Sequence, residues 1–164
     1  MAAKAGPRVI NALQRSLVTE DNCFGNIPAA RSLLAIADPA GLDALRRAIQ
    51  GGLPLVFMTF LAPLGRYEDI PLFVAAWREL PPSDPLNQMP TFTRAIGRTG
   101  GEMAAATLHQ LLDGANVKAR ISVVQGLGVV KHPAAVPALL SALNDEDTLV
   151  QSWARWELQG CRLF

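Results

Sequence analysis

The chain has few residues that could hold a metal ion or build a disulfide framework. Its 164 residues include only 2 cysteines and 2 histidines. Cys23 and Cys161 lie far apart without metal-ligand spacing, and neither His109 nor His132 is followed by Glu. A disulfide scaffold is therefore not expected, and the cysteines are interpreted as reduced, structural residues of an intracellular protein. We also expect no metal and no cofactor.

An excess of charge of one sign is lacking as well. Lys and Arg number 15 against 14 Asp and Glu, so the formal net charge is +1. Proteins that bind nucleic acids usually show a clear basic excess, and we therefore expect no nucleic-acid partner. Half of the residues are hydrophobic, which is too many for a disordered chain and predicts a folded core.

Long hydrophobic runs are missing too. A membrane-spanning helix needs about 20 consecutive apolar residues. The nearest approach is "LPLVFMTFLAPLG" at residues 53–65, which is short and interrupted by Pro63, so that a buried helix is predicted instead. The beginning of the chain lacks the apolar core of a secretion signal. These observations predict a cytoplasmic protein that does not enter a membrane.

A short apolar pattern recurs along the chain. The segment "VPALLSAL" at residues 136–143 has four earlier counterparts, and in all five copies the first, fourth and eighth positions are apolar. The spacing i, i+3 and i+7 places these side chains on one face of a helix. The earlier copies are "INALQRSL" (10–17), "LDALRRAI" (42–49), "IPLFVAAW" (70–77) and "AATLHQLL" (105–112).

A further helix is predicted after each copy. Pro39 and Pro133 suit a first helical turn, while Gly100, Gly101 and Gly114 suit helix ends. No strand-like alternation is long enough for a sheet. The pattern predicts an all-α fold, an α-solenoid of about five helix pairs (an α-α superhelix) in one domain, residues 1–164. The further helices are expected at 25–34, 53–62, 88–97, 119–128 and 150–159.

The repeat over residues 117–160 resembles the short HEAT-like repeat of phycobilisome lyase subunits and of many bacterial HEAT proteins. Arg120 matches the family arginine, Gly128 the Leu-Gly turn, Pro137 the Val-Pro pair and Asp145 the loop aspartate. The resemblance is fair over 61–116 and weak before residue 60. A regular Arg–Asp ladder is not predicted, because the arginine position is occupied in the other copies by Asn26, Pro54, Met89 and Gln151.

Residues that could perform chemistry have simpler interpretations. His132, just before a proline, is interpreted as a helix cap, and His109 lies beside the apolar face without an obvious acid–base partner. The loop "NDED" at 144–147 is interpreted as a solvated loop before a helix N-terminus rather than a cation site. "GRTGGE" at 97–102 lacks the strand and lysine of a phosphate loop. No catalytic residue is predicted, although an enzymatic role stays open.

The leading interpretation is a non-catalytic protein–protein interaction module, a scaffold or adaptor that holds a partner on its concave face. In this family the second helix of each pair lines that face, and the repeating pattern is assigned to the second helix. The exposed positions of these helices make the end near the N-terminus basic, which favours a partner with an acidic patch. The candidate residues are Arg15, Arg46, Arg47, Arg78, His109 and Gln110.

Two further possibilities remain open from the sequence. Trp153 and Trp156 either pack as a terminal cap or form an exposed apolar patch for a partner or a second copy of the chain. The alternative function is that of a bilin lyase subunit or a related chromophore-handling protein, whose partner is a phycobiliprotein. Arginines would then bind the propionates of the bilin, and aromatic side chains would contact the pigment.

Overall fold

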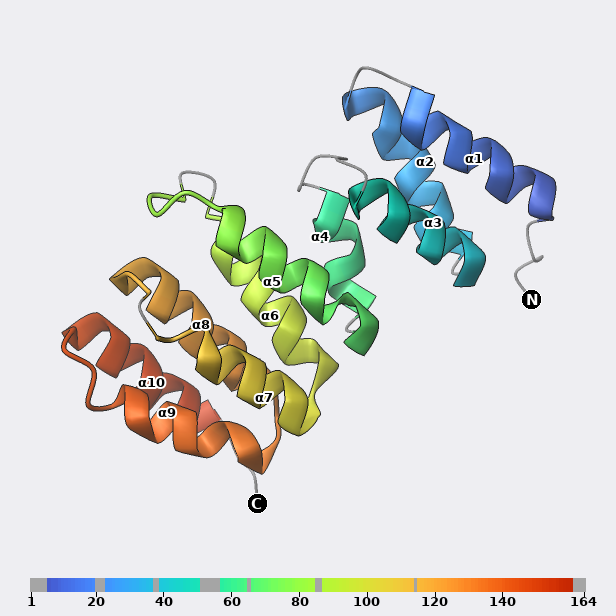
Figure 1. Cartoon of the computed structure of the whole chain (residues 1–164). Helices are drawn as coiled ribbons and strands as arrows, with labels where there is room; N and C mark the ends of the chain where they lie inside the picture. The colour runs from blue at the N-terminus through green and yellow to red at the C-terminus, as the bar shows by residue number, and fades with distance from the viewer. Residues whose placement is uncertain are drawn as a thin grey trace. The chain divides into compact units, whose positions relative to one another are not determined.

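The computed structural model describes residues 6–19, 23–36, 39–50, 57–64, 66–84, 87–113 and 115–160. Within these residues the chain is all-α, with no strand, which agrees with the α-solenoid class of fold (Figure 1). The chain divides into two compact units, Met1–Leu61 (unit 1) and Ala62–Phe164 (unit 2). Predictions about Pro54, Gly114 and Cys161, and about the side chains of Cys23 and Asn26, lie outside the described residues.

Unit 1 contains the helices α1 (Pro7–Thr19), α2 (Cys23–Ile36), α3 (Pro39–Gln50) and α4 (Met58–Leu61). α1 packs on α2 and α3, and α2 also contacts α3 and α4. The core at these contacts includes Leu33, Leu42 and Leu45, all fully buried. Burial of these side chains provides the main stabilisation of this small unit.

Unit 2 begins with the 3₁₀ turns η2 (Ala62–Leu64) and η3 (Tyr67–Asp69) and continues with three helix pairs. α6, α8 and α10 lie next to one another as one layer, and α5, α7 and α9 pack against it as a second layer (Figure 1). The 3₁₀ turn η4 precedes α9 and packs on α7. The helices are α5 (Ile70–Glu79), α6 (Met89–Thr99), α7 (Gly101–Gln110), α8 (Val117–Val129), η4 (Pro133–Ala135), α9 (Val136–Ala142) and α10 (Thr148–Gly160).

The repeating apolar pattern correctly predicts which side chains of these helices face the core. None of its fifteen positions is exposed; ten are buried, and five are partly exposed. Leu108 and Leu139, at equivalent positions of α7 and α9, are both fully buried. The helices of one repeat cannot cover these side chains alone, and so stacked repeats are required. The partly exposed positions are Leu13, Trp77, Leu112, Val136 and Leu143.

Helix starts and ends largely follow the predicted residues. Pro39 begins α3 and Pro133 begins η4, where the missing N–H costs no hydrogen bond. Gly100 and Gly101 separate α6 from α7 with φ of 73° and 71°, a conformation that strains residues with a Cβ. Gly128 differs from its expected role, because it lies inside α8 and not in a turn. The helix ends one residue later, at Val129, and Lys131 adopts the positive φ of 49°.

Candidate interaction surfaces

Arg120 on α8 is the centre of the best-connected polar cluster in unit 2. Its Nε and Nη2 each donate to one carboxylate oxygen of Asp145 at 2.9 Å, and Nη2 also donates to Glu146 at 3.0 Å. Its Nη1 donates to the carbonyl oxygen of Ala115 at 2.8 Å. Since Asp145 and Glu146 belong to the loop "NDED", this loop is tied to α8 by an internal ion pair and is less free than the solvated loop that the sequence predicted.

Arg120 and Asp145 each shift the pKa of the other. Desolvation would raise the pKa of Asp145, but hydrogen bonds from Arg120 and from the backbone N–H of Asp147, together with the charge of Arg120, lower that pKa below its ordinary value. The hydrogen bond to Asp145 raises the pKa of Arg120 in turn, against the opposing effect of desolvation. Both side chains are mostly shielded, with exposed fractions of 14% and 12%. Arg120 and Asp145 therefore act as a structural pair.

Lys118, two residues before Arg120 on α8, holds the loop between α5 and α6. Its Nζ donates to the carbonyl oxygens of Ser83 and Asp84, both at 2.7 Å. The buried carboxylate of Asp84 accepts from the backbone N–H groups of Gln88 and Met89 at 2.8 and 2.9 Å, which caps the start of α6. The basic residues at the beginning of α8 thus fasten one loop before it and one loop after it.

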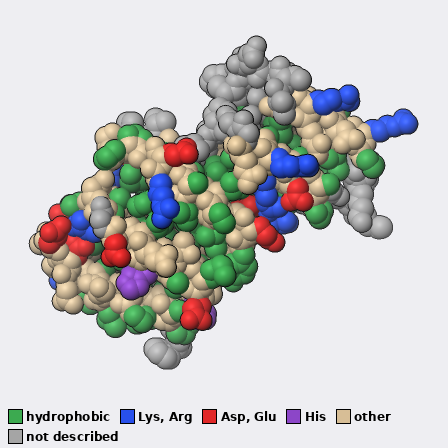
Figure 2. All heavy atoms as spheres, in the orientation of Figure 1, with side chains coloured by type: hydrophobic (Ala, Val, Ile, Leu, Met, Phe, Trp, Pro, Cys, Tyr) green, Lys and Arg blue, Asp and Glu red, His purple; other side chains and the backbone are tan. Residues whose placement is uncertain are grey.

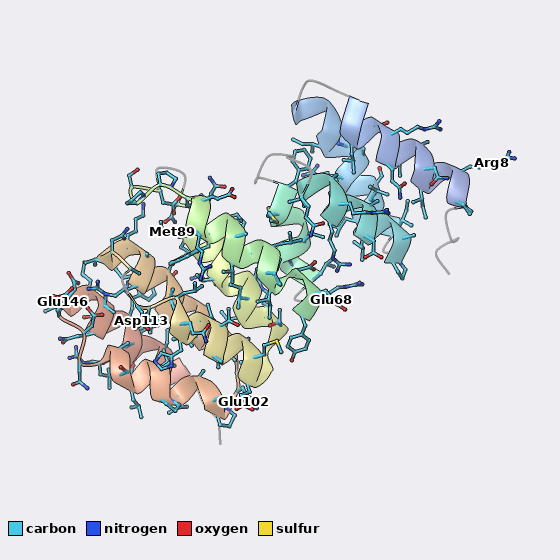
Figure 3. All side chains as sticks on the ribbon, viewed as in Figure 1. Arg8, Glu68, Met89, Glu102, Asp113 and Glu146 are labelled. Carbon is cyan, nitrogen blue, oxygen red and sulfur yellow. The ribbon has the colours of Figure 1, made fainter. Side chains whose placement is uncertain are left out.

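A shallow hollow of about 550 Å³ lies next to the Arg120–Asp145 pair. Its lining includes Asp113 and Glu146, both labelled in Figure 3. The donors of Arg120 that face it are already engaged by carboxylates and a carbonyl group. The hollow is therefore an opening beside a structural ion pair.

The predicted basic residues near the N-terminus lie on α1 and α3 of unit 1. Arg15 and Arg47 are exposed, and Arg46 is partly buried. Arg46 donates to Asp43 at 2.7 Å, and Nε of Arg47 donates to the carbonyl oxygen of Asp43 at 3.3 Å. Part of the positive charge is thus neutralised within α3, while Arg15 and Arg47 remain at the surface.

The other predicted residues lie in unit 2. Arg78 on α5 and His109 and Gln110 on α7 are exposed. On α10, Trp153 is partly buried and Trp156 is 68% exposed. Trp153 therefore behaves as the terminal cap would, whereas Trp156 lies at the surface.

His132 has the capping role that its position before a proline predicts. Its Nδ1 accepts a hydrogen bond from the backbone N–H of Ala134 at 3.2 Å, at the start of η4. Among the described residues, no group of three or more His, Cys, Asp and Glu side chains is arranged to hold a metal ion. The described helices include none that is long and apolar enough to cross a membrane.

Sequence reasoning missed a polar group in the layer of α6, α8 and α10. Gln125 on α8 is 8% exposed, and its Oε1 has no hydrogen-bond partner. Glu157 on α10 places its carboxyl group against Gly128, and the charge of Arg94 on α6 acts on it. The signal in the sequence was a glutamine between valines and glycines in "VVQGLG", and a glutamate between apolar residues in "WARWELQ".

The comparison with known families agrees with this architecture. The family model described as HEAT repeats matches residues 91–159, from the first turn of α6 to the last turn of α10. None of the curated proteins matches the chain. The match includes the stretch in which the residue pattern is strongest and supports a HEAT-like repeat protein.

Proposed function

We propose that the protein is a non-catalytic protein–protein interaction module of the scaffold or adaptor type. HEAT repeats commonly mediate protein interaction. The observation that carries the proposal is the exposure of large apolar side chains on α7 and α9, where Met103 is 63% and Leu140 49% exposed. Apolar groups of this size on a rigid helical surface provide the contacts on which association depends.

The second helices of the repeats are the proposed contact surface. Met103 on α7 and Leu140 on α9 are exposed in the same layer as Arg78, His109 and Gln110. Figure 2 shows hydrophobic side chains between scattered charged ones on this part of the molecule. A partner that docks here would cover apolar area with a few polar contacts at the rim. The basic residues near the N-terminus add the proposal of a partner with an acidic patch, bound at Arg15 and Arg47.

Site-specific photo-crosslinking tests the proposed surface. A benzophenone amino acid is placed at position 103 or 140 in the intact chain, with position 81 in the exposed loop after α5 as the matched control. We expect one specific adduct from positions 103 and 140 and none from position 81. Absence of an adduct from both surface positions contradicts the proposal.

A bilin titration separates this function from the alternative of a bilin lyase subunit. The interaction module should leave the absorbance spectrum of an added bilin unchanged. A saturable shift of the absorbance, lost on replacing arginines of the chain, would overturn the proposal and favour a chromophore-handling protein.

A further inference from the structure

The exposed side of α10 carries a stripe of large apolar side chains. Leu149 and Trp156 are 59% and 68% exposed, and Trp153 between them is partly exposed. Spacings of four and three residues place these three side chains on one face of the helix. Val150 and Ala154, which are fully buried, occupy the face of α10 that packs into unit 2. The stripe is therefore accessible along about two turns of the helix.

A stripe of this kind differs from scattered apolar residues on a surface. Single exposed apolar side chains are common in proteins, whereas a contiguous row of them marks a site of association. The stripe lies on a helix of the layer α6, α8 and α10, and the contact surface proposed above belongs to α7 and α9. The stripe therefore requires an occupant of its own.

The spacing along the stripe suits a second copy of the same helix. Apolar residues separated by four and then three residues form the seam of a coiled coil, in which each side chain fills a hole between side chains of the facing helix. If two α10 helices pair in opposite directions about a two-fold axis near Ser152 and Trp153, Leu149 of one copy faces Trp156 of the other. The smaller side chain then meets the larger one at both ends, and so the stripe complements itself.

The polar residues beside the stripe do not oppose such a pair. Ser152 and Gln159 on one edge are exposed and uncharged. Glu157 on the other edge is partly buried, and the charge of Arg94 acts on it. In the antiparallel pair the two Glu157 residues would be about 14 Å apart along the axis, which is more than the roughly 10 Å over which exposed charges interact at 0.1 M salt.

The charges at the two ends of α10 favour the antiparallel direction. Glu146 and Asp147 precede the helix, and the side chain of Glu146 is 84% exposed. Arg155 lies in the second half of the helix, where it donates to the neutral Oε1 of Gln151 at 3.2 Å, a contact that leaves its charge uncompensated. Pairing in opposite directions brings Arg155 of each copy toward the acidic start of the other. Pairing in the same direction would bring like charges together.

We propose that the chain forms a symmetric dimer in which the α10 helices of two copies pack antiparallel through Leu149, Trp153 and Trp156. Since a tryptophan buries at most about 250 Å², three side chains per copy provide less area than the roughly 800 Å² per partner of a standard interface. The dimer is therefore reversible, with a dissociation constant of roughly 10–100 μM. It does not depend on the partner proposed for α7 and α9, and it would bring two of those contact surfaces into one assembly.

Sedimentation velocity of the intact chain tests the dimer over a concentration range of about 5 to 500 μM. We expect a concentration-dependent change from the mass of one chain to the mass of two, together with a blue shift of the tryptophan emission as Trp156 leaves water. A chain that stays monomeric at about 500 μM overturns the proposal. Growth beyond two chains overturns it as well, because a two-fold pair is closed.

Two matched substitutions locate the interface. Trp156→Ser should weaken the dimer about tenfold or more, because a buried tryptophan often carries much of the affinity of an interface. Met103→Ser removes a side chain of similar exposure, 63%, from α7 and should leave the dimer unchanged. Both positions are at the surface, so the melting temperature of the dilute monomer should stay close to that of the parent. An unchanged dimer in Trp156→Ser, or a lost dimer in Met103→Ser, overturns the assignment to α10.

Cross-linking determines the direction of the two helices. In a chain with Cys23→Ser and Cys161→Ser, either Ser152→Cys or Gln159→Cys is introduced, and a short bismaleimide is added. The two copies of position 152 lie side by side near the two-fold axis, whereas the two copies of position 159 lie about 20 Å apart along it, because each residue advances a helix by about 1.5 Å. We expect cross-linked dimers from position 152 alone. Equal cross-linking from both positions would indicate parallel helices, and cross-linking from neither would place the interface elsewhere; each result overturns the proposal.

Discussion

Glu157 links the stability of unit 2 to pH. Because burial raises its pKa, the folded protein holds this proton more tightly than the unfolded chain does. The stabilisation is complete below the pKa of the unfolded chain and is lost as the pH rises through the pKa of the folded protein. Glu157→Gln cannot ionise, and it should therefore melt at a higher temperature than the parent at pH 7.

The comparison of melting temperatures across pH checks this sign. The advantage of Glu157→Gln should disappear toward low pH, where the parent carboxyl group is neutral as well. The control Glu68→Gln, at an exposed position of η3, should follow the parent throughout. If Glu157→Gln melts below the parent at pH 7, the carboxylate is held by an interaction that its position against Gly128 does not reveal.

Asp145 and Glu146 are neighbours that contact the same arginine, but only one of them is shielded. The side chain of Asp145 is 12% exposed and that of Glu146 is 84% exposed. Asp145→Asn should cost about 2–3 kcal/mol of unfolding free energy, because the charge of Arg120 would remain shielded without its main partner. Glu146→Gln should cost at most about 1 kcal/mol, the range of solvated ion pairs.

Urea denaturation at neutral pH measures both losses. Since the pKa of Asp145 is lowered, its contribution is present above the unfolded-state pKa and is lost as the pH falls through the folded-state value. The difference between parent and Asp145→Asn should therefore shrink in acid. Equal losses in Asp145→Asn and Glu146→Gln would show that the geometry of the pair does not determine its strength.

At the scale of helices, α6 and α8 approach each other through glycines. A Cβ at Gly126 would lie 2.7 Å from the carbonyl oxygen of Thr93, and a Cβ at Gly97 would meet the carbonyl oxygen of Gly126. Thr93 also donates from Oγ1 to the carbonyl oxygen of Ser122 at 2.6 Å. The two backbones are thus in direct contact, and the interface has no room for a methyl group.

Gly126→Ala should therefore separate α6 from α8. Alanine favours a helix over glycine by about 1 kcal/mol, but crowding in a packed interface costs about 1–3 kcal/mol, so that a net loss of stability is expected. Gly160→Ala, at the end of α10 with nothing within 4 Å of its Cβ, should be neutral or stabilising. Thermal melts of the two variants give the comparison. A gain of stability in Gly126→Ala would contradict the close approach.

The sequence predicts the helices better than it predicts the contacts between them. The spacing of Phe73, Leu108 and Leu139 identifies buried positions, because helical period and burial are both local properties of the pattern. The role of Gly128 depends on Glu157, which lies 29 residues later on another helix. The burial of Gln125 likewise depends on α6 and α10. Such polar sites require the register between helices, which no local pattern contains.

For the whole molecule, the division into two units makes a prediction about folding. Unit 2 contains three stacked helix pairs, with Phe73, Phe92 and Val123 fully buried, and its loops are fastened to α8 by Lys118 and Arg120. In repeat proteins the stability is close to a sum of repeat and nearest-neighbour terms, so that a block of adjacent repeats can fold alone. The fragment 62–164 should therefore remain helical and unfold cooperatively.

Circular dichroism and urea denaturation of the fragment 62–164 check this prediction. The same measurements on the fragment with Asp145→Asn compare the loss of unfolding free energy with the loss in the full chain. The substitution should cost the fragment the same free energy, about 2–3 kcal/mol, as it costs the full chain, because Asp145, Glu146 and Ala115, which accept hydrogen bonds from Arg120, belong to unit 2. A fragment that is unfolded on its own would show that unit 1 contributes a stabilising interface. A folded fragment with a much smaller loss would show that the ion pair needs residues before 62.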